Sequence, residues 1–322
     1  MIITRTPLRI SFTGGGTDLA EYYMINGGAV VSMAINKYIY ITVNRKFDRA
    51  IRVSYSSTEI VQEVSELHHD LVREAMRLAG ITGGIEVTSV ADIPSGTGLG
   101  SSSSFTVGVL NALFTYAGNR LSDKELAELA CKIEIDILGH PIGKQDQYAA
   151  AYGGLNYFRF HSDGTVSDNK IELSETDWRA LGRKLVLFYT GITRSADEVL
   201  TEQKKNTRNK IDVLNEMKDQ ANEMYRELTA NGFGRSFGEA LHEGWLKKQT
   251  LAGTISNPTL NNYYDAAIAA GAVGGKLLGA GGGGFMLFYC DEENQSRLRD
   301  ELNLRQVDFA PDHYGSRVVY FA

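Results

Sequence analysis

A glycine- and serine-rich stretch, IPSGTGLGSSSS, runs from Ile93 to Ser104 and precedes apolar residues at helical spacing. Glycine is costly at the start of a helix unless the backbone must bend sharply or let another group approach closely. A glycine-rich turn that enters a helix can present several backbone N–H groups to an anion, and the helix N-terminus adds a partial positive charge. Serine hydroxyls at the same place can bind a phosphate oxygen or a magnesium ion. The glycines alone fit an anion site and a flexible loop capped by Ser101 equally well.

Three widespread motifs do not match this stretch. The P-loop of nucleoside-triphosphate hydrolases ends in Gly-Lys-Ser or Gly-Lys-Thr, which is missing here. The dinucleotide-binding fingerprint places its third glycine one position later than Gly96, Gly98 and Gly100 do. The serine hydrolase elbow needs Gly-x-Ser-x-Gly, which the stretch also lacks.

A second candidate segment, SDKELAELACKIEIDIL, is acidic and helical. Ser122 and Glu125 form the sequence signature of a capping box at its start. Helical periodicity predicts one buried stripe, with Glu134 and Asp136 flanking it on opposite sides, so it does not choose between these two carboxylates. The residues of the stripe are Leu126, Ala130, Ile133 and Ile137.

Asp146 lies further along, in GKQDQY. A carboxylate beside a bound substrate can act as a general base. Its neighbours alone favour a simpler role, because Pro141 and Gly143 just upstream are typical of a helix start that Asp146 would cap.

The composition limits the classes of protein to which these residues can belong. The chain has 322 residues, of which 43% are hydrophobic and 22% charged, as in a globular protein of one large or two ordinary domains. A formal charge of −6 argues against a nucleic-acid partner, because phosphate backbones need a basic surface. The six histidines have no metal-ligand spacing, and His68 and His69 are expected on the surface. With two cysteines, no membrane-length apolar run and no signal-peptide pattern, we expect a cytoplasmic protein without a membrane partner.

The elements that must position these residues are of mixed type. Strand and helix patterns alternate irregularly, which favours an α+β fold over a doubly wound sheet. The expected strands are PLRISFT, VVSMAINKYIYITVNR, AIRVSYS, GIEVTSV, LNYFRF, KLVLFYTG and SRVVYFA, and a long polar helical stretch covers about Ala196 to Thr229. The turn-rich HSDGTVSDN, near residues 161–183, predicts a boundary between one domain of residues 1–170 and another of residues 171–322.

Four segments, in order along nearly the whole chain, resemble the motifs of the GHMP kinases. TPLRISFTGGGTD resembles the first motif and PSGTGLGSSSS the phosphate-binding motif. EIDILGHPIGKQDQYAAAYGG resembles the segment that carries the catalytic aspartate of the sugar kinases, and KLLGAGGGGFMLF resembles the third motif. The resemblance implies an N-terminal domain like domain 2 of ribosomal protein S5 and a ferredoxin-like C-terminal domain, with ATP and a sugar meeting in the cleft between them.

The resemblance also implies roles for the matching residues. Asp146 becomes the base that takes the proton of the sugar hydroxyl, and Arg9 the cation that stabilises the transferring phosphoryl group or tunes Asp146. Glu134 and Ser102 become ligands of a magnesium ion. The implied phosphate-binding residues are Pro94, Gly96, Gly98, Leu99, Gly100, Ser101, Ser102, Ser103 and Ser104, and the implied sugar-binding residues are Gly15, Gly16, Thr17, Asp18, Gly281 and Gly282. Without the resemblance, Arg9 fits a surface arginine on a strand edge and Asp18 an Asx turn.

Within the family, RTPLRISFTGGGTD and YTGITRSA are most similar to the D-glycero-D-manno-heptose 7-phosphate kinases, with the fucokinase-type domains nearby. The similarity implies ATP- and magnesium-dependent phosphorylation of the anomeric hydroxyl of that sugar phosphate to the 1,7-bisphosphate, in nucleotide-heptose synthesis. A substrate that already carries a phosphate needs a cation, for which Arg194 is the first candidate and Lys276 the second.

Other interpretations stay open at this point. A fucokinase or another anomeric sugar kinase has the same motifs, a non-catalytic sugar sensor can retain the fold, and a decarboxylase of the mevalonate pathway shares it. Galactokinases carry Gly-Glu-His-Thr-Asp where this chain has Gly14-Gly15-Gly16-Thr17-Asp18, which argues against galactose. The oligomeric state is also open, with a homodimer as one alternative.

Overall fold

Within the residues that the structure describes, 1–193 and 196–322, eight strands form the first of two sheets. The structure is a computed structural model. The strand order is β12–β1–β2–β5–β3–β4, and β6 pairs with the first half of β2 while β7 pairs with β6. The strands are β1 (Ile2–Thr13), β2 (Gly28–Arg45), β3 (Ile51–Ser54), β4 (Thr58–Val61), β5 (Ile85–Ala91), β6 (Leu155–Phe160), β7 (Val166–Lys170) and β12 (Arg317–Phe321).

β1 and β2 are the central pair of this sheet, and both are rich in β-branched and aromatic residues, which favour the extended backbone. Their antiparallel register sets Arg9 opposite Ala34. On the other edge of β1, the Arg9 backbone N–H donates to Leu99 O at 3.0 Å, so the serine-rich loop covers that edge. Arg9 is 3% exposed, and the alternative of a surface arginine on a strand edge is therefore wrong.

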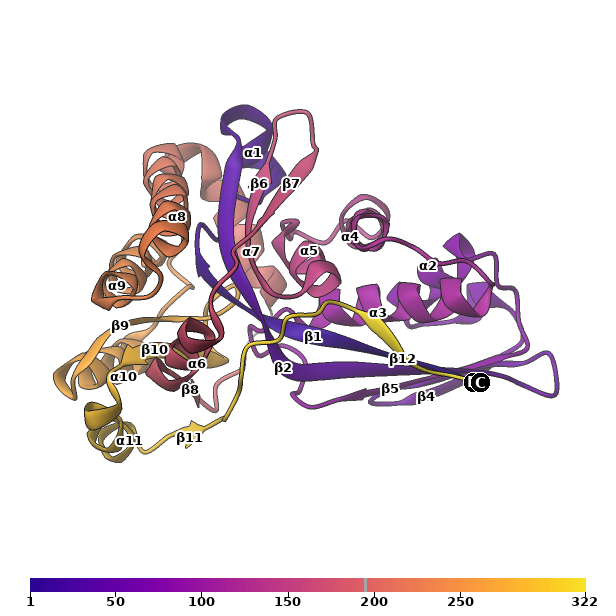
Figure 1. Ribbon diagram of the computed structural model, residues 1–322. Coiled ribbons are helices and arrows are strands. Elements are labelled where there is room, and N and C mark those ends of the chain that lie inside the picture. Colours follow the sequence, from indigo (N-terminus) through magenta and orange to yellow (C-terminus); the bar gives the residue numbers. More distant parts are fainter. Residues whose placement is uncertain (194–195) are drawn as a thin grey trace.

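Helices cover one face of the sheet (Figure 1). They are α2 (Asp70–Leu78), α3 (Ser101–Tyr116), α4 (Asp123–Cys131) and α5 (Gln145–Tyr152), while the short α1 (Ala20–Asn26) connects β1 to β2. α3 lies very close to β1: Thr4 Oγ1 donates to Gly108 O at 3.0 Å, and a Cβ at Gly108 would lie 2.8 Å from Thr6 Oγ1. This close packing fixes the start of α3 beside Arg9.

The acidic helix follows the expected capping box but then changes its winding. Ser122 Oγ accepts from the Glu125 backbone N–H at 3.3 Å, which confirms the box. After α4, residues Lys132–Ile137 form a π-helical turn. The wider turn shifts the phase of the side chains, so that Glu134 is 0% exposed and Ile137 is 44% exposed. The prediction that Ile137 belongs to the buried stripe is wrong for this reason.

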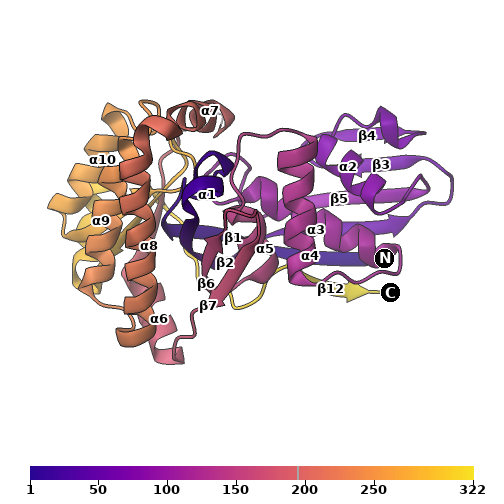
Figure 2. The same cartoon turned by 90° about the horizontal axis from the view of Figure 1, so that it is seen from above.

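The second unit is a four-stranded antiparallel sheet of order β11–β8–β10–β9. Figure 2 shows that the helices of this unit gather at one end of the first sheet. The strands of the second unit are β8 (Leu185–Tyr189), β9 (Ala272–Leu277), β10 (Phe285–Cys290) and β11 (Arg305–Gln306). Its helices are α6 (Glu175–Lys184), α7 (Ala196–Asn206), α8 (Ile211–Asn231), α9 (Arg235–Gln249), α10 (Pro258–Ala269) and α11 (Gln295–Leu302). Phe12 of β1 packs edge-on against Phe237 of α9, with ring centroids 5.0 Å apart, so an apolar contact joins the two units.

The last strand returns to the first sheet. β12 pairs with β1, with Phe321 opposite Ile2, and the Thr6 and Ser316 hydroxyls hydrogen-bond at 2.8 Å. Both chain ends therefore lie side by side at one end of the first sheet (Figure 1). A division after residue 170 leaves this strand in the sheet of the other unit. Residues 166–170, which the turn-rich pattern assigned to a connection, form β7 instead.

Short 3₁₀ segments complete the fold at Val64–Glu66, Thr207–Lys210 and Glu292–Asn294. Among the described helices, none combines the length and the apolar character that crossing a membrane would need.

Candidate active site

Two adjoining pockets lie where the first sheet and its helices face the second unit. The glycine-turn pocket is lined by Arg9, Ser11, Gly15, Gly16, Asp18, Leu19, Ile142, Gly143, Gln145, Asp146, Leu200, Gln203, Lys248, Lys276, Gly279 and Ala280. The serine-loop pocket is lined by Arg9, Gly96, Gly98, Gly100, Ser101, Ser102, Ser103, His140, Ile142, Asp146, Ala196, Asp197, Leu200, Leu278, Gly279, Ala280, Gly281 and Gly283. Arg9 and Asp146 line both, so they stand where a molecule in one pocket would meet a molecule in the other.

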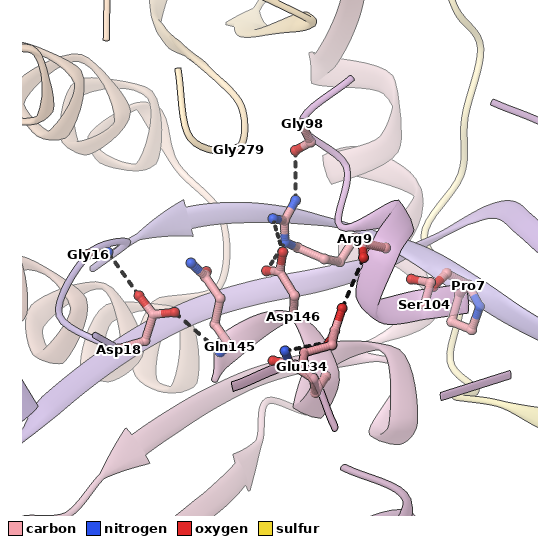
Figure 3. Close-up of polar contacts among 12 residues, drawn as sticks. Pro7, Arg9, Gly16, Asp18, Gly98, Ser104, Glu134, Gln145, Asp146 and Gly279 are labelled. Atoms are coloured by element: carbon pink, nitrogen blue, oxygen red, sulfur yellow. Dashed lines mark hydrogen bonds and ion pairs between the residues drawn. The ribbon is translucent and has the colours of Figure 1, made fainter. Parts of the chain in front are cut away.

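Arg9 and Asp146 form a bidentate ion pair at this junction (Figure 3). Arg9 Nε donates to Asp146 Oδ1 and Nη2 donates to Oδ2, both at 2.7 Å. Arg9 Nη1 also donates to Gly98 O at 2.8 Å, which ties the arginine to the serine-rich loop. Asp146 is the second residue of α5, whose N-cap is Lys144, so its carboxylate pairs with Arg9 rather than capping the helix.

The serine-rich loop needs its glycines for backbone shape and for close approach. Gly96, Gly98 and Gly100 all have positive φ, between 74° and 86°, which disfavours any residue with a Cβ. A Cβ at Gly98 would also lie 2.5 Å from Leu278 O of the second unit. The loop therefore presses against the connection after β9 while its backbone turns into α3.

The four serines point in different directions. Ser101, Ser102 and Ser103 line the serine-loop pocket, and Ser102 Oγ donates to Glu134 Oε1 at 2.9 Å. Ser104 Oγ donates to Pro7 O at 2.8 Å and faces β1 (Figure 3), so this hydroxyl fixes α3 on the sheet. Two other residues of the expected phosphate-binding set, Pro94 and Leu99, line neither of these pockets, and the Leu99 side chain is 0% exposed.

Glu134 reaches the site because of the π-helical turn. Its second carboxylate oxygen, Oε2, accepts from Gln147 Nε2 at 2.7 Å. Burial raises the pKa of Glu134, while hydrogen bonds from Gln147 and Ser102 act in the opposite direction. Glu134 and Ser102 thus offer two neighbouring oxygen ligands, with Ser102 lining the serine-loop pocket and Glu134 buried directly behind it. Among the described residues, no group of three or more His, Cys, Asp or Glu side chains could hold a metal by itself.

The glycine turn of the first motif places Asp18 in the other pocket. Asp18 is 3% exposed, and its Oδ1 accepts from the Gly16 backbone N–H at 2.9 Å while Oδ2 accepts from the Gln145 backbone N–H at 3.3 Å. Burial, with the nearby Asp146 charge, raises the pKa of Asp18. Gly15 and Gly16 also line this pocket. Thr17 does not, because its hydroxyl lies within hydrogen-bond distance of Gly14 O and Ala29 O and so holds the turn together.

The residues of the third glycine motif are divided between the two pockets. Gly279 and Ala280 belong to both, whereas Gly281 belongs to the serine-loop pocket and Gly282 to neither. The Gly282 backbone N–H donates to Ile255 O at 2.8 Å. Of the two glycines that the resemblance assigns to the sugar, Gly281 therefore lines the serine-loop pocket and Gly282 lines neither pocket.

Two lysines complete the glycine-turn pocket from the second unit. Lys276 of β9 was a candidate from the sequence, and it is 5% exposed with Nζ donating to Phe12 O at 2.7 Å. Lys248 of α9 was not a candidate from the sequence. It stands in WLKKQ, a pattern that is typical of the solvent face of a helix. It is 6% exposed and donates to Gly279 O. Arg194, the other cation expected from the sequence, lies outside the described residues.

A third pocket adjoins the serine-rich loop and is aromatic. It is lined by Ile39, Tyr55, Ser56, His69, Leu71, Ser89, Ala91, Ile93, Ser95, Ser101, Ser102 and Phe105, and shares Ser101 and Ser102 with the serine-loop pocket. The His69 ring stacks on Phe105 at 4.9 Å and 18°, and Tyr55 meets His69 edge-on at 4.6 Å. His69 is therefore half-buried rather than a surface residue, and burial lowers its pKa.

Comparisons with known proteins identify the family and relatives of this chain. The family described as GHMP kinases N terminal domain matches residues 60–154, and the family described as GHMP kinases C terminal matches residues 224–307. The chain is 32% identical, over 95% of its length and 94% of the relative's, to a D-glycero-alpha-D-manno-heptose 7-phosphate kinase of Campylobacter jejuni. It is 28% identical, over 92% of its length but only 35% of the relative's, to an L-fucokinase/L-fucose-1-P guanylyltransferase of Bacteroides fragilis.

The solved structures agree with the sequence matches. A crystal structure described as a D-glycero-D-manno-heptose 1-phosphate kinase from Bacteroides thetaiotaomicron superposes with a TM-score of 0.83 and 26% identity, covering 100% of both chains. These matches confirm the α+β fold with its S5 domain 2-like first unit and ferredoxin-like second unit. The chain belongs to the GHMP kinase family and is a phosphotransferase.

Proposed function

We propose that this protein transfers the γ-phosphoryl group of ATP to the anomeric hydroxyl of D-glycero-D-manno-heptose 7-phosphate, giving the 1,7-bisphosphate for nucleotide-heptose synthesis. The observation that carries the proposal is the Arg9–Asp146 pair, which lines both pockets. A kinase needs its two substrates in line, with a base beside the attacking hydroxyl and a cation beside the transferring group. In this proposal the serine-loop pocket takes the ATP phosphates and the glycine-turn pocket takes the sugar.

Asp146 is the proposed base. Arg9 occupies one lone pair on each carboxylate oxygen, which leaves further acceptor sites for the sugar hydroxyl. The hydroxyl oxygen forms a bond to the γ-phosphorus, the bond between that phosphorus and the bridging oxygen of ADP breaks, and the hydroxyl proton passes to Asp146. Arg9 stands between the carboxylate and Gly98 of the loop, where negative charge on the transferring group would be stabilised.

The proposed nucleotide site extends along the loop into the aromatic pocket. Backbone N–H groups at the start of α3 would receive the phosphates. Ser101 and Ser102 connect this cradle to the pocket of Tyr55, His69 and Phe105, whose rings offer flat apolar faces to the adenine base.

Ser102 and Glu134 would hold a magnesium ion, since a hydroxyl and a carboxylate are the hard oxygen ligands that this ion prefers. When bound, the ion neutralises charge on the phosphates of ATP. The chain supplies two ligands, the usual number where phosphate oxygens and water complete the shell. Gln147 orients the second Glu134 oxygen and so keeps the first one aimed at Ser102.

The relatives of this chain indicate two candidate sugars. The 32% identity to the heptose 7-phosphate kinase favours the phosphorylated heptose, and the match to the fucokinase domain keeps L-fucose as the alternative substrate. Asp18, held by two backbone N–H groups, is placed to accept hydrogen bonds from sugar hydroxyls in either case.

Steady-state turnover of ATP separates the two substrates. D-glycero-D-manno-heptose 7-phosphate, the free heptose, L-fucose and D-mannose are compared at equal concentration, and the product is assigned by phosphorus NMR. The proposal predicts the highest kcat/KM for the heptose 7-phosphate and a new anomeric phosphate signal. Faster turnover of free fucose would replace it with the fucokinase function.

A further inference from the structure

We propose that Lys248 and Lys276 form the site that holds the phosphate already present on the sugar substrate, and that they make the enzyme select phosphorylated sugars. The inference rests on the proposed function, because it concerns the sugar end of the same cleft. Both side chains come from the second unit and line the glycine-turn pocket, and neither lines the serine-loop pocket.

The charges of the glycine-turn pocket do not balance. The Asp146 carboxylate is already paired with Arg9. Within residues 1–193 and 196–322, no carboxylate oxygen lies within 4.0 Å of either lysine ammonium. Asp18 is the one remaining acid among the lining residues, so an excess of positive charge faces the pocket.

Both ammonium groups are buried and each is bonded to a single backbone carbonyl. Lys276 Nζ donates to Phe12 O at 2.7 Å, and Lys248 Nζ donates to Gly279 O. An ammonium has three donors, so two on each lysine remain for a ligand. Burying like charges close together is costly unless an anion enters. Burial lowers the pKa of Lys248 to about 8 and lowers that of Lys276 as well. A neutral sugar would leave this cost in place, whereas a phosphate dianion would remove it.

The spacing of Arg9 and Phe12 along β1 also agrees with a phosphorylated sugar as the ligand. Arg9 marks the point of phosphoryl transfer, and Lys276 is bonded three residues further along the strand, at Phe12. At about 3.3 Å per residue this is roughly 10 Å. A sugar with its phosphate on the carbon farthest from the anomeric centre separates the two groups by a comparable length.

The first test compares Lys248→Met and Lys276→Met with Lys218→Met as the matched control. Lys218 also donates to a backbone carbonyl, Asn26 O at 3.0 Å, but it lines neither pocket. With heptose 7-phosphate, each pocket variant should raise KM at least tenfold and change the KM of ATP less than twofold. With the free heptose, KM should change less than threefold.

Equal losses on the two sugars, or an unchanged KM for the phosphorylated one, would overturn the inference while leaving the proposed function intact. A wild-type enzyme that prefers free sugars would instead overturn the proposed function. The variants therefore test the inference, and the wild-type enzyme tests the proposed function.

The second test needs no variant and so does not depend on whether the variants fold. Binding of heptose 7-phosphate to the wild-type protein is titrated calorimetrically at pH 8.5 in two buffers of different ionisation enthalpy. The groups that face Lys248 are Arg9, Asp18, Asp146 and Lys276. A phosphate beside the lysines favours their charged forms, so binding should take up protons, and the free heptose should take up none. Absence of proton uptake with the phosphorylated sugar contradicts the inference.

Discussion

Aspartate stands in two different environments at positions 136 and 146. Asp136 is exposed within the π-helical turn, whereas Asp146 lies at the junction of two pockets with both oxygens bound by Arg9. Burial and partner, rather than residue type, therefore decide which carboxylate can act on a substrate. Glu134, a fully buried carboxylate, is set apart from Asp146 by its partners, a hydroxyl and an amide.

Asp146→Asn should lower kcat by roughly two to four orders of magnitude, because it removes the proposed base while keeping the shape of the side chain. ATP affinity should change little, since the serine-rich loop is untouched. Quenched-flow turnover and calorimetric ATP binding measure the two effects, and Asp136→Asn is the control that should behave as wild type. A variant that retained more than about a tenth of the wild-type rate would show that Arg9 and the loop carry the reaction.

At the scale of elements, the start of α3 combines two functions within one turn. Ser102 faces Glu134 and the pocket, and Ser104 faces Pro7 and the sheet. The loop before it is held between β1 and the connection after β9, through Arg9 on one side and Leu278 on the other. The helix therefore forms part of the proposed phosphate cradle and also anchors it to the sheet.

Substitutions of Ser102 and of Ser104 should have different effects. Ser102→Ala should raise the magnesium concentration needed for half-maximal rate, because it removes one of two protein ligands, and should change stability little. Ser104→Ala should instead lower the free energy of unfolding by about 1 kcal/mol, since it removes a buried hydrogen bond, and should leave the magnesium dependence unchanged. Magnesium titrations of the rate and urea unfolding give both numbers. The assignment fails when the two variants show the same magnesium dependence.

Gly98 and Gly96 of the serine-rich loop offer a second matched comparison. Gly98→Ala places a Cβ 2.5 Å from Leu278 O and so must shift the loop, whereas Gly96→Ala meets nothing within 4 Å. Both have positive φ, so both carry a backbone strain of roughly 1 kcal/mol. ATP affinity, measured by calorimetry, should fall at least tenfold in the first and less than threefold in the second. Equal affinities would mean that the contact with Leu278 does not shape the cradle.

Much of this site could be predicted from the sequence where function depends on local motifs. The strands around Arg9 and the loop before α3 follow from alternation and glycine spacing, and the resemblance selected Asp146 over a cap. Glu134 required the resemblance too, because a π-helical turn breaks the 3.6-residue period on which the stripe was based. The error at Ile137 has the same cause.

Other parts of the site had no signal in the sequence. Lys248 reaches the pocket only because α9 packs across the end of β1, through contacts such as Phe12 with Phe237. Adjacent lysines on a helix are usually solvated, so local pattern favoured the wrong environment. The split of the glycine motif between two pockets likewise depends on how the two units meet.

At the scale of the whole molecule, the proposed site is complete only when the two units are together. The first unit supplies Arg9 and Asp146, and the second supplies Gly279 and the two lysines. Glu134 of the first unit contacts the site through Ser102. The buried lysines oppose this arrangement when no ligand is present, because their charged forms lose hydration. The buried charge of Lys248 is therefore needed to bind the phosphorylated sugar in this proposal, but it lowers the stability of the free protein.

Lys248→Met should stabilise the free protein at neutral pH while weakening catalysis. The Lys248 pKa is about 8 in the folded protein and near 10.5 when unfolded, so below pH 8 the folded state bears the full cost of the buried charge, up to about 3 kcal/mol. Between pH 8 and 10.5 only the unfolded chain binds the proton, so wild-type stability rises with pH and the advantage of the variant shrinks. Urea unfolding of both proteins at pH 7 and pH 10 measures the difference. A variant advantage that does not decrease with pH would contradict the assignment.

The pairing of β12 with β1 has a consequence for biosynthesis. Ile2 leaves the ribosome about 320 residues before its partner Phe321. At about 5–20 residues per second, the outer edge of β1 waits roughly 15 to 60 s for the strand that covers it. Until then its backbone N–H and C=O groups form an open strand edge, the kind of surface at which nascent chains pair with one another. The segment of β1 that leads to Arg9 therefore depends on protection during translation.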